Sequence, residues 1–464
     1  MNILIRDKRI QLLAGLLLAS GIIVVKGISG PDILMWRTVA LTVLMVYLWL
    51  REVIPIYVTA LLPLAMSSVL GILTPKDLAL AYGDTNIYLF LGGFILALGL
   101  EKHRIHLQIS QRIIRIVGNT KSRLLLAVIL STGIISMWIS NTATALMMLP
   151  IGMAILKARP EHERQSRFGV LLVLSIAYAA SIGGAGTLIG SPPNLIMAAL
   201  VNQAPYHANI DFVSWAIVGI PFSLIFLFIL FMVFRLRLGK EGTEKIELDN
   251  LTVEPWSANQ LRVVTIFSVV VLLWLTKDIS AALFHFSYTD VFPSMLGAVL
   301  LFIIPRANKR KPLLSWKSVR NIPWGILLLF GGGIAVASAL QKHGVIALIA
   351  DSFSLFTTLP IVVILLIVVT ISVFTTELVS NTALTNILVP IVAAFALASH
   401  LSVAQLSIAV TLGASWAFML PVGTPPNAIA FASGAVTMKD MIRNGLILNI
   451  ISVILITVLT SLFL

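Results

Sequence analysis

The stretch Ser140-Asn141-Thr142-Ala143-Thr144 lies inside a long apolar run that closes with Leu149-Pro150. A second copy, Ser380-Asn381-Thr382-Ala383-Leu384, lies inside another apolar run that closes with Val389-Pro390. The two Ser-Asn-Thr triplets are 240 residues apart, and the two prolines have the same spacing. A pattern that recurs at one fixed spacing indicates that the chain is built from two related halves.

Each triplet is followed by a second polar segment that contains a double proline. The first is Gly186-Thr187-Leu188-Ile189-Gly190-Ser191-Pro192-Pro193-Asn194, and the second is Pro421-Val422-Gly423-Thr424-Pro425-Pro426-Asn427. Proline does not continue an α-helix from the preceding turn, so each segment predicts a helix that breaks within an apolar run. We expect the closing asparagine of each segment to cap the helix that resumes. Upstream, Gly92-Gly93 recurs as Gly332-Gly333, again 240 residues apart.

The composition is typical of an integral membrane protein. Hydrophobic residues make up 58% of the chain and charged residues only 11%, whereas a soluble globular protein is about 25% charged. Several apolar runs approach or exceed the roughly 20 residues that cross a bilayer. The chain has no cysteine, which excludes disulfide and thiol chemistry. We therefore expect an all-α polytopic protein surrounded by a lipid bilayer. We expect this bilayer to be a bacterial cell (plasma) membrane.

The order of the apolar runs predicts 11 transmembrane helices and two re-entrant hairpins. Five crossings fall in each repeat, and an odd number of crossings inverts the second repeat relative to the first. Two crossings are expected to be broken, near 168–200 and near 402–436, and span 3 is expected near 53–72. The parts are the N-terminal span 1 within residues 1–32, the first repeat at 33–234 with its hairpin at 124–156, a cytoplasmic linker at 235–262, and the second repeat at 263–464 with its hairpin at 353–398.

The net charge of +13 is explained by topology. No basic domain outside the apolar runs is long enough to form a nucleic-acid-binding face, so we expect no nucleic-acid partner. With the N-terminus in the cytoplasm and the C-terminus outside, 27 of the 32 Lys and Arg residues fall in cytoplasmic segments. This asymmetry is what the positive-inside rule predicts. The remaining five are Lys26, Arg37, Lys76, Lys277 and Lys342.

The polar residues at the predicted breaks favour an anion site that also holds cations. Broken helices expose N–H groups that suit anions and carbonyls that suit cations, and the amides of Asn141 and Asn381 serve either. The segments 124–156, 168–201 and 401–436 contain no charged residue or histidine, so an anion bound there needs charge from co-bound cations. The one acid in the second hairpin, Glu377, is either a cation ligand or, as we favour, a packed structural group.

A single triplet in a membrane helix more often joins neighbouring helices, but two in register at inverted positions favour a binding site.

The motifs resemble the divalent anion–sodium symporter family, the transporters of Krebs-cycle dicarboxylates and citrate, over the whole chain after span 1. The resemblance implies a homodimer in which a mobile transport domain carries substrate across by an elevator movement. It also implies contacts to substrate carboxylates from Ser140, Asn141, Thr142, Ser191, Pro192, Ser380, Asn381, Thr382, Thr424 and Pro425.

The same resemblance implies two sodium sites, with sodium as the coupling ion and no other cofactor. The first maps to Ser136, Ser140, Asn141 and Gly190, and the second to Thr376, Ser380, Asn381 and Gly423. The chain departs from the family pattern at Leu384, Ser191 and Gly423, where Thr, Thr and Ala are common. These departures bear on the size of the substrate that the site accepts and on the residues that form the second cation site.

The leading interpretation is a sodium-coupled secondary transporter of C4–C6 di- or tricarboxylates such as succinate, malate, fumarate, 2-oxoglutarate or citrate. A sodium-independent dicarboxylate exchanger of the same family remains open. An ion channel is a more distant alternative, because re-entrant hairpins also build filters, but an inverted pair within one chain favours alternating access. An intramembrane enzyme needs a nucleophile–base or metal constellation, and none is visible in the predicted spans.

Overall fold

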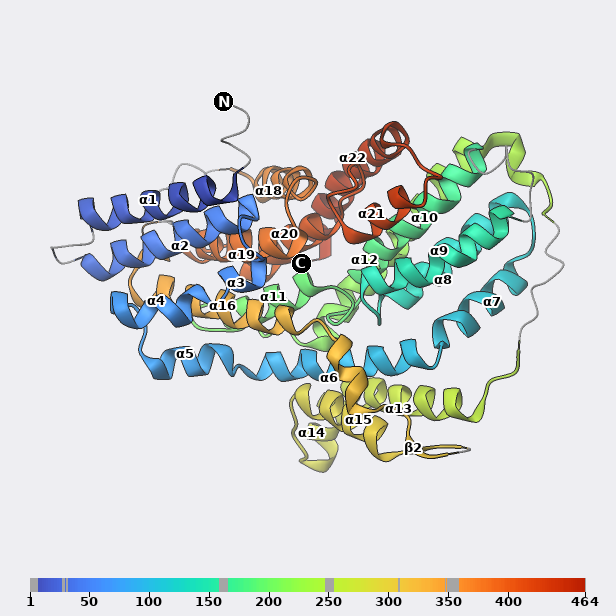
Figure 1. Ribbon diagram of the computed structural model, residues 1–464, viewed down its shortest axis with the longest axis horizontal. Helices are drawn as coiled ribbons and strands as arrows, with labels where there is room; N and C mark the ends of the chain where they lie inside the picture. The colour runs from blue at the N-terminus through green and yellow to red at the C-terminus, as the bar shows by residue number, and fades with distance from the viewer. Residues whose placement is uncertain are drawn as a thin grey trace.

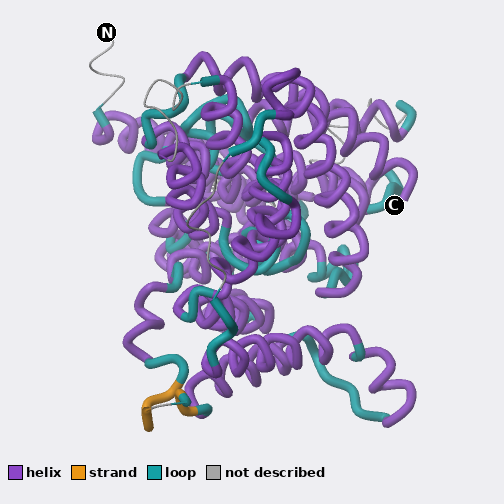
Figure 2. Tube along the Cα trace, turned by 90° about the vertical axis from the view of Figure 1, so that its right-hand side faces the viewer, coloured by secondary structure: helices purple, strands orange, loops and turns teal. Residues whose placement is uncertain are grey.

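The structure, a computed structural model, describes residues 7–26, 30, 32–157, 166–246, 254–307, 309–346, 348 and 359–463 (Figure 1). This part of the chain is helical apart from its connections and one antiparallel ribbon, β1 (Pro305–Arg306) with β2 (Lys309–Pro312). Figure 2 shows the ribbon at one edge of the molecule. The all-helical architecture predicted from the sequence is confirmed, and the ribbon was not predicted.

The N-terminal helices lead from the start of the described chain to the first hairpin. They are α1 (Lys8–Lys26), α2 (Ile33–Arg51), α3 (Ile56–Thr59), α4 (Leu62–Leu70), α5 (Pro75–Tyr82), α6 (Thr85–Lys102) and α7 (Ile105–Val117). The span predicted near 53–72 is bent into α3 and α4 rather than continuous. Pro63 lies in the first turn of α4 and has no N–H to donate to Thr59, so one helix does not run through both.

Two pairs of helices follow, over the residues where the sequence predicts the first hairpin and the first broken helix. In the first pair, α8 (Lys121–Ser136) is followed by a turn that ends at Ser140, and the rest of the first triplet opens α9 (Asn141–Lys157). The first double proline opens α11 (Pro192–Val201), after α10 (Arg167–Gly184) has ended. The half closes with α12 (Phe212–Leu238) and η3 (Gly239–Thr243).

In the second half, a triplet at the start of one helix is again followed by a double proline at the start of a later one. This half contains α13 (Ala258–Leu275), α14 (Lys277–Phe284), α15 (Val291–Ile303), η4 (Trp316–Asn321), α16 (Trp324–Lys342), α18 (Ile361–Thr375), α19 (Asn381–Ala398), α20 (Val403–Ser415), α21 (Pro425–Ala432) and α22 (Met438–Phe463). The second triplet begins at Ser380, the N-cap of α19, and continues into that helix, and the second double proline opens α21. The start of the predicted second hairpin, part of the linker and parts of the span 1 segment lie outside the described residues.

Positions 240 residues apart make matching contacts in the two halves. His103 follows the last residue of α6, and its Nε2 lies 3.1 Å from the carbonyl oxygen of Leu313. His343 follows the last residue of α16, and its Nε2 lies 2.7 Å from the carbonyl oxygen of Ile72. Each histidine therefore joins the end of a long helix to a backbone carbonyl far away in the sequence.

Helix α10 packs against four other helices, α8, α9, α12 and α21 (Figure 1). It begins at Ser166, whose hydroxyl accepts the N–H of Gly169 and caps the helix. Almost every residue of α10 is buried, as expected of a helix that is apolar on all sides. By contrast, α1 packs against α2 at the periphery and is mostly exposed.

Nine helical segments among the described residues are long and apolar enough to cross a membrane, judged by length and composition. Shorter apolar helices include α9, α11, α18 and α20, which belong to the predicted hairpins and broken spans. The chain is therefore a multi-pass membrane protein. Which short helices complete a crossing, and in which direction each helix runs through the bilayer, stays a prediction.

Candidate functional site

A pocket of about 790 Å³ lies where both hairpin turns meet both broken helices. All ten predicted substrate-contacting residues line it, although they come from four separate regions of the sequence. They are Ser140, Asn141, Thr142, Ser191, Pro192, Ser380, Asn381, Thr382, Thr424 and Pro425. The structure thus brings the two halves of the sequence pattern together around one space, and the role of each residue in binding stays a prediction.

Four helices begin at this pocket. Their first residues are Asn141 of α9, Pro192 of α11, Asn381 of α19 and Pro425 of α21, and each of these residues lines the pocket. The first N–H groups of a helix have no partner within the helix, and they carry the positive end of the helix dipole. The pocket therefore gathers four partial positive charges from the backbone, a geometry that suits an anion.

A buried hydroxyl lies behind the first triplet. Ser136 Oγ is 2.9 Å from Oδ1 of Asn141 and 2.7 Å from the carbonyl oxygen of Ala180 in α10. A hydroxyl carries one proton, so it cannot donate a full hydrogen bond to both of these acceptors. Three oxygen atoms with one proton between them are the type of surroundings that a hard cation prefers.

The second triplet has the same arrangement. Thr376 Oγ1 is 2.8 Å from Oδ1 of Asn381 and 2.6 Å from the carbonyl oxygen of Ala414 in α20. The Nδ2 of Asn381 in turn donates to the carbonyl oxygen of Ser415 at 3.3 Å. The pairing of the two predicted sodium sites therefore extends to individual atoms.

Three of the residues predicted to bind sodium do not line the pocket. Ser136 and Thr376 are fully buried behind the turns. Gly190 packs on the first turn, because a Cβ built there would lie 2.8 Å from the carbonyl oxygen of Met137 and 2.9 Å from that of Ser136. A side chain at this position would therefore push the broken helix away from the hairpin. The other five, Ser140, Asn141, Ser380, Asn381 and Gly423, line the pocket.

The closing asparagines of the double-proline segments do not cap the resuming helices, so that prediction is wrong. Ser191 and Thr424 occupy the N-cap positions of α11 and α21. Asn194 Nδ2 instead donates to the carbonyl oxygens of Gly184 and Thr187, at 2.9 and 2.8 Å.

Asn427 makes the equivalent bonds in the second half. Its Nδ2 donates to the carbonyl oxygens of Ala417 at 3.0 Å and Leu420 at 3.1 Å. Each side chain thus satisfies carbonyls that the break leaves without helical partners. The sequence did contain a signal for this role. Each asparagine stands three residues after the N-cap residue, so it lies inside the first turn of the helix and cannot cap it.

The remaining wall of the pocket comes from other helices. The segment around Glu52 and Tyr57, the end of α6 with Glu101, and the start of α16 at Pro323 and Ile326 all contribute to it. No Lys or Arg is present among the described lining residues. Sequence reasoning missed both acids, because nothing in their spacing connects them to the triplets.

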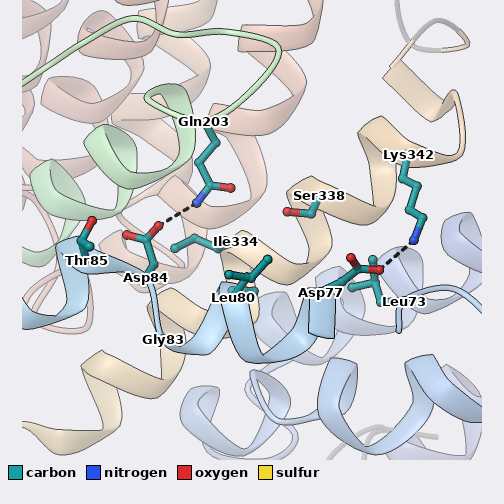
Figure 3. A pocket seen from close by; sticks show the side chains of 11 residues that line it. Leu73, Asp77, Leu80, Gly83, Asp84, Thr85, Gln203, Ile334, Ser338 and Lys342 are labelled. Atoms are coloured by element: carbon teal, nitrogen blue, oxygen red, sulfur yellow. Dashed lines mark hydrogen bonds and ion pairs between the residues drawn. The ribbon is translucent and has the colours of Figure 1, made fainter. Parts of the chain in front are cut away.

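A second cavity, of about 430 Å³, lies between α5, the start of α6, and α16 (Figure 3). Its charged side chains already have partners: Lys342 Nζ lies 2.7 Å from Asp77 Oδ2, and Gln203 Nε2 donates to Asp84 Oδ2 at 3.2 Å. This cavity shares no lining residue with the first pocket. Among the described residues there is also no group of three His, Asp or Glu side chains that could hold a metal ion.

Comparison with known proteins gives a consistent result. The family model described as citrate transporter matches residues 46–413. The sodium-dependent dicarboxylate transporter SdcS of Staphylococcus saprophyticus is 35% identical over 437 residues, which cover 90% of this chain and 84% of that protein. The protein of the same name from Staphylococcus aureus is 35% identical over 449 residues, which cover 92% and 86%. The crystal structure of the Alcanivorax borkumensis YdaH transporter is similar in fold, with a TM-score of 0.58 at 14% identity, covering 86% of this chain and 88% of that one.

Proposed function

The chain belongs to the divalent anion–sodium symporter family, and we propose that it is a sodium-coupled secondary transporter of C4–C6 di- or tricarboxylates. The observation that carries this proposal is the convergence of four helix N-termini and two triplet amides on one pocket, whose lining within the described chain includes no Lys or Arg. Such a site attracts carboxylates through backbone dipoles, and it needs added cations to balance a dianion. The related proteins named as sodium-dependent dicarboxylate transporters support the same assignment.

The doubling of the site favours a substrate with at least two carboxylates. Each half-site consists of a triplet, the residue before a double proline and the first proline of that pair, all of which line the pocket. We propose that each half-site receives one carboxylate, through helix N–H groups and the amide of Asn141 or Asn381. Succinate and malate have this shape, and the pocket volume of about 790 Å³ leaves room for fumarate, 2-oxoglutarate or citrate.

Sodium is proposed to bind at the two oxygen clusters behind the triplets. Ser136 and Thr376 each face an asparagine Oδ1 and a backbone carbonyl within 3 Å. A cation at either place would share its asparagine with the half-site in front. Because the same amide then contacts both the ion and the carboxylate, binding of one favours binding of the other.

The proposed topology makes the described conformation inward-facing. The pocket wall includes Glu52, Glu101 and Asn321, which lie at ends of helices that the distribution of Lys and Arg places on the cytoplasmic side. We propose 11 crossings with two re-entrant hairpins in an inverted repeat, the domain bounds given above, and a homodimer. The hairpins and broken helices would move as one transport domain against the wall formed by α6 and α16.

The experiment that tests the function is uptake of labelled succinate by purified protein in proteoliposomes. An inward sodium gradient should drive accumulation without any dicarboxylate inside the vesicles. Malate should compete, whereas butyrate, which has one carboxylate and a similar length, should not. Uptake that requires internal dicarboxylate and ignores sodium would identify an exchanger, and equal competition by butyrate would refute the two-carboxylate site.

A further inference from the structure

Glu377 is a buried acid whose role the proposed function leaves open. It lies in the turn between α18 and α19, is 3% exposed and does not line the pocket. Its Oε1 accepts the backbone N–H groups of Phe418 at 2.7 Å and Met419 at 2.8 Å, and its Oε2 accepts that of Leu420 at 2.9 Å. Asn449 of α22 donates a fourth bond, from Nδ2 to Oε1 at 2.8 Å.

These four donors indicate whether the Glu377 side chain carries a proton. All are N–H groups, and none accepts a proton, so the arrangement fits an ionised carboxylate. The ion pairs found among the described residues involve other acids. The charge of Glu377 is therefore balanced by backbone N–H dipoles and one amide, and its position is fixed by three consecutive residues of another segment.

The loop that Glu377 holds leads directly into the second half-site. Residues 418–420 precede Gly423 and Thr424, which line the pocket. A Cβ built on Gly423 would lie 3.1 Å from Glu377 Oε2 and 3.4 Å from its Cα, so the loop rests on the hairpin turn. We propose that Glu377 is the positioning residue of the second half-site, because its carboxylate fixes this loop against the turn that carries the second triplet.

The first half joins the same two segments without a charge. The residue 240 positions before Glu377 is Met137, whose carbonyl accepts the hydroxyl of Thr187 in the first loop. A Cβ built on Gly186 would lie 2.8 Å from Met137 Cγ, so the methionine side chain packs against that loop. Neutral contacts therefore hold the first loop against its turn, whereas a buried carboxylate holds the second loop.

This inference rests on the proposed function for its consequence in binding. Removing the carboxylate leaves three backbone N–H groups and the Asn449 amide without their acceptor, and it frees Gly423 and Thr424 to move away from Thr376 and Asn381. The second cation cluster and the second carboxylate contact should then weaken together. The first half-site, held by Met137 and Thr187, should remain ordered.

The test uses the full-length protein in lipid nanodiscs and two measurements. Hydrogen exchange by mass spectrometry follows peptides that cover 416–424 and 183–190, and titration follows succinate binding at increasing sodium. The first variant is Glu377→Gln, which keeps the shape of the side chain but replaces one acceptor oxygen with an NH₂ group that faces the backbone N–H donors. The second is Asn449→Ala, which removes only the hydrogen bond from the Asn449 amide. Thr187→Val is the matched change in the first half, and Glu254→Gln, at an exposed acid, is the charge-matched control.

Glu377→Gln should speed exchange in 416–424 but not in 183–190, and should raise the sodium concentration for half-maximal succinate binding by about tenfold. Asn449→Ala should change both readouts in the same direction by less, and Thr187→Val should loosen 183–190 alone. Unchanged exchange in 416–424, or equal loosening of both loops, would overturn the positioning role. If the wild-type protein binds no dicarboxylate, the proposed function fails, and the exchange data still decide whether Glu377 holds the loop.

Discussion

At the scale of single residues, Asn141 and Asn381 each serve two sides of the site. The Oδ1 atom of each faces a buried hydroxyl, while the residue itself lines the pocket. Because one amide contacts both the proposed ion and the proposed carboxylate, its loss should weaken both interactions. We therefore propose these two residues as the most direct link between sodium and substrate.

Asn141→Ala and Asn381→Ala should each weaken succinate binding by roughly tenfold to a hundredfold, since an orphaned buried partner costs about 1–3 kcal/mol. Calorimetry or a competition assay on purified protein measures the change. Asn386→Ala is the matched control, because Asn386 is a buried asparagine of α19 that bonds the carbonyl oxygen of Thr382 and does not line the pocket. Full affinity in both triplet variants would mean that the triplets only join helices.

Ser136 and Thr376 give a prediction about sodium alone. Replacing either with Ala removes one oxygen from a cluster behind the pocket and leaves the lining residues unchanged. We expect these variants to need a higher sodium concentration for half-maximal uptake. At saturating sodium, the substrate concentration for half-maximal uptake should be little changed. Thr376→Ser keeps the hydroxyl and should behave like the wild type. A sodium dependence identical in Thr376→Ala and Thr376→Ser would remove Thr376 from the cation site.

At the scale of elements, the breaks in α10–α11 and α20–α21 are stabilised by side chains from inside the resuming helices. Asn194 bonds the carbonyls of Gly184, the last residue of α10, and of Thr187 in the connecting loop, and Asn427 bonds two carbonyls of the loop after α20. Both carbonyls lie in protein rather than lipid, the setting in which irregular backbone is tolerated at membrane depth. The double proline therefore prevents a continuous helix, and the asparagine makes the resulting loop stable.

Asn194→Ala and Asn427→Ala should each lower the free energy of unfolding by about 1–3 kcal/mol, because two buried carbonyls lose their donor. Thermal unfolding of the detergent-purified variants would show a lower melting temperature. Ser407→Ala is a suitable control in α20, since Ser407 is fully buried and its Oγ has no hydrogen-bond partner in the part of the chain that the structure describes. If the asparagine variants have the same melting temperature as the Ser407→Ala control, the loops are held by packing alone.

Most of the elements could be predicted from the sequence because apolar runs and prolines act locally. The two turns and the two double-proline breaks followed from the repeat, and the ten residues around the pocket followed from the resemblance to a known family. The bend between α3 and α4 and the short helix α5 did not, because each depends on one proline or cap within an apolar run. The short helix α14 was not predicted either, since it has no proline and no side-chain cap to mark its start. Glu52 and Glu101 reach the pocket only through packing between distant helices, which no local pattern encodes.

At the scale of the whole molecule, the distribution of Lys and Arg gives a testable topology. The chain has no cysteine, so a single introduced one reports its own side of the membrane. Ser287 and Thr243 are both exposed, and the inverted repeat puts the first outside and the second in the cytoplasm. In intact cells Ser287→Cys should react with a membrane-impermeant maleimide, and Thr243→Cys should react only after permeabilisation. Reaction of both from one side would contradict the inverted repeat.

Sodium coupling is the claim on which the rest of the account depends, and succinate binding to the purified protein in sodium or in choline tests it most directly. By linkage, a coupled carrier must bind succinate more tightly with sodium and sodium more tightly with succinate, by the same factor. The account predicts a dissociation constant at least about tenfold lower in sodium, a difference of about 1.4 kcal/mol. Equal dissociation constants in the two salts would contradict sodium coupling.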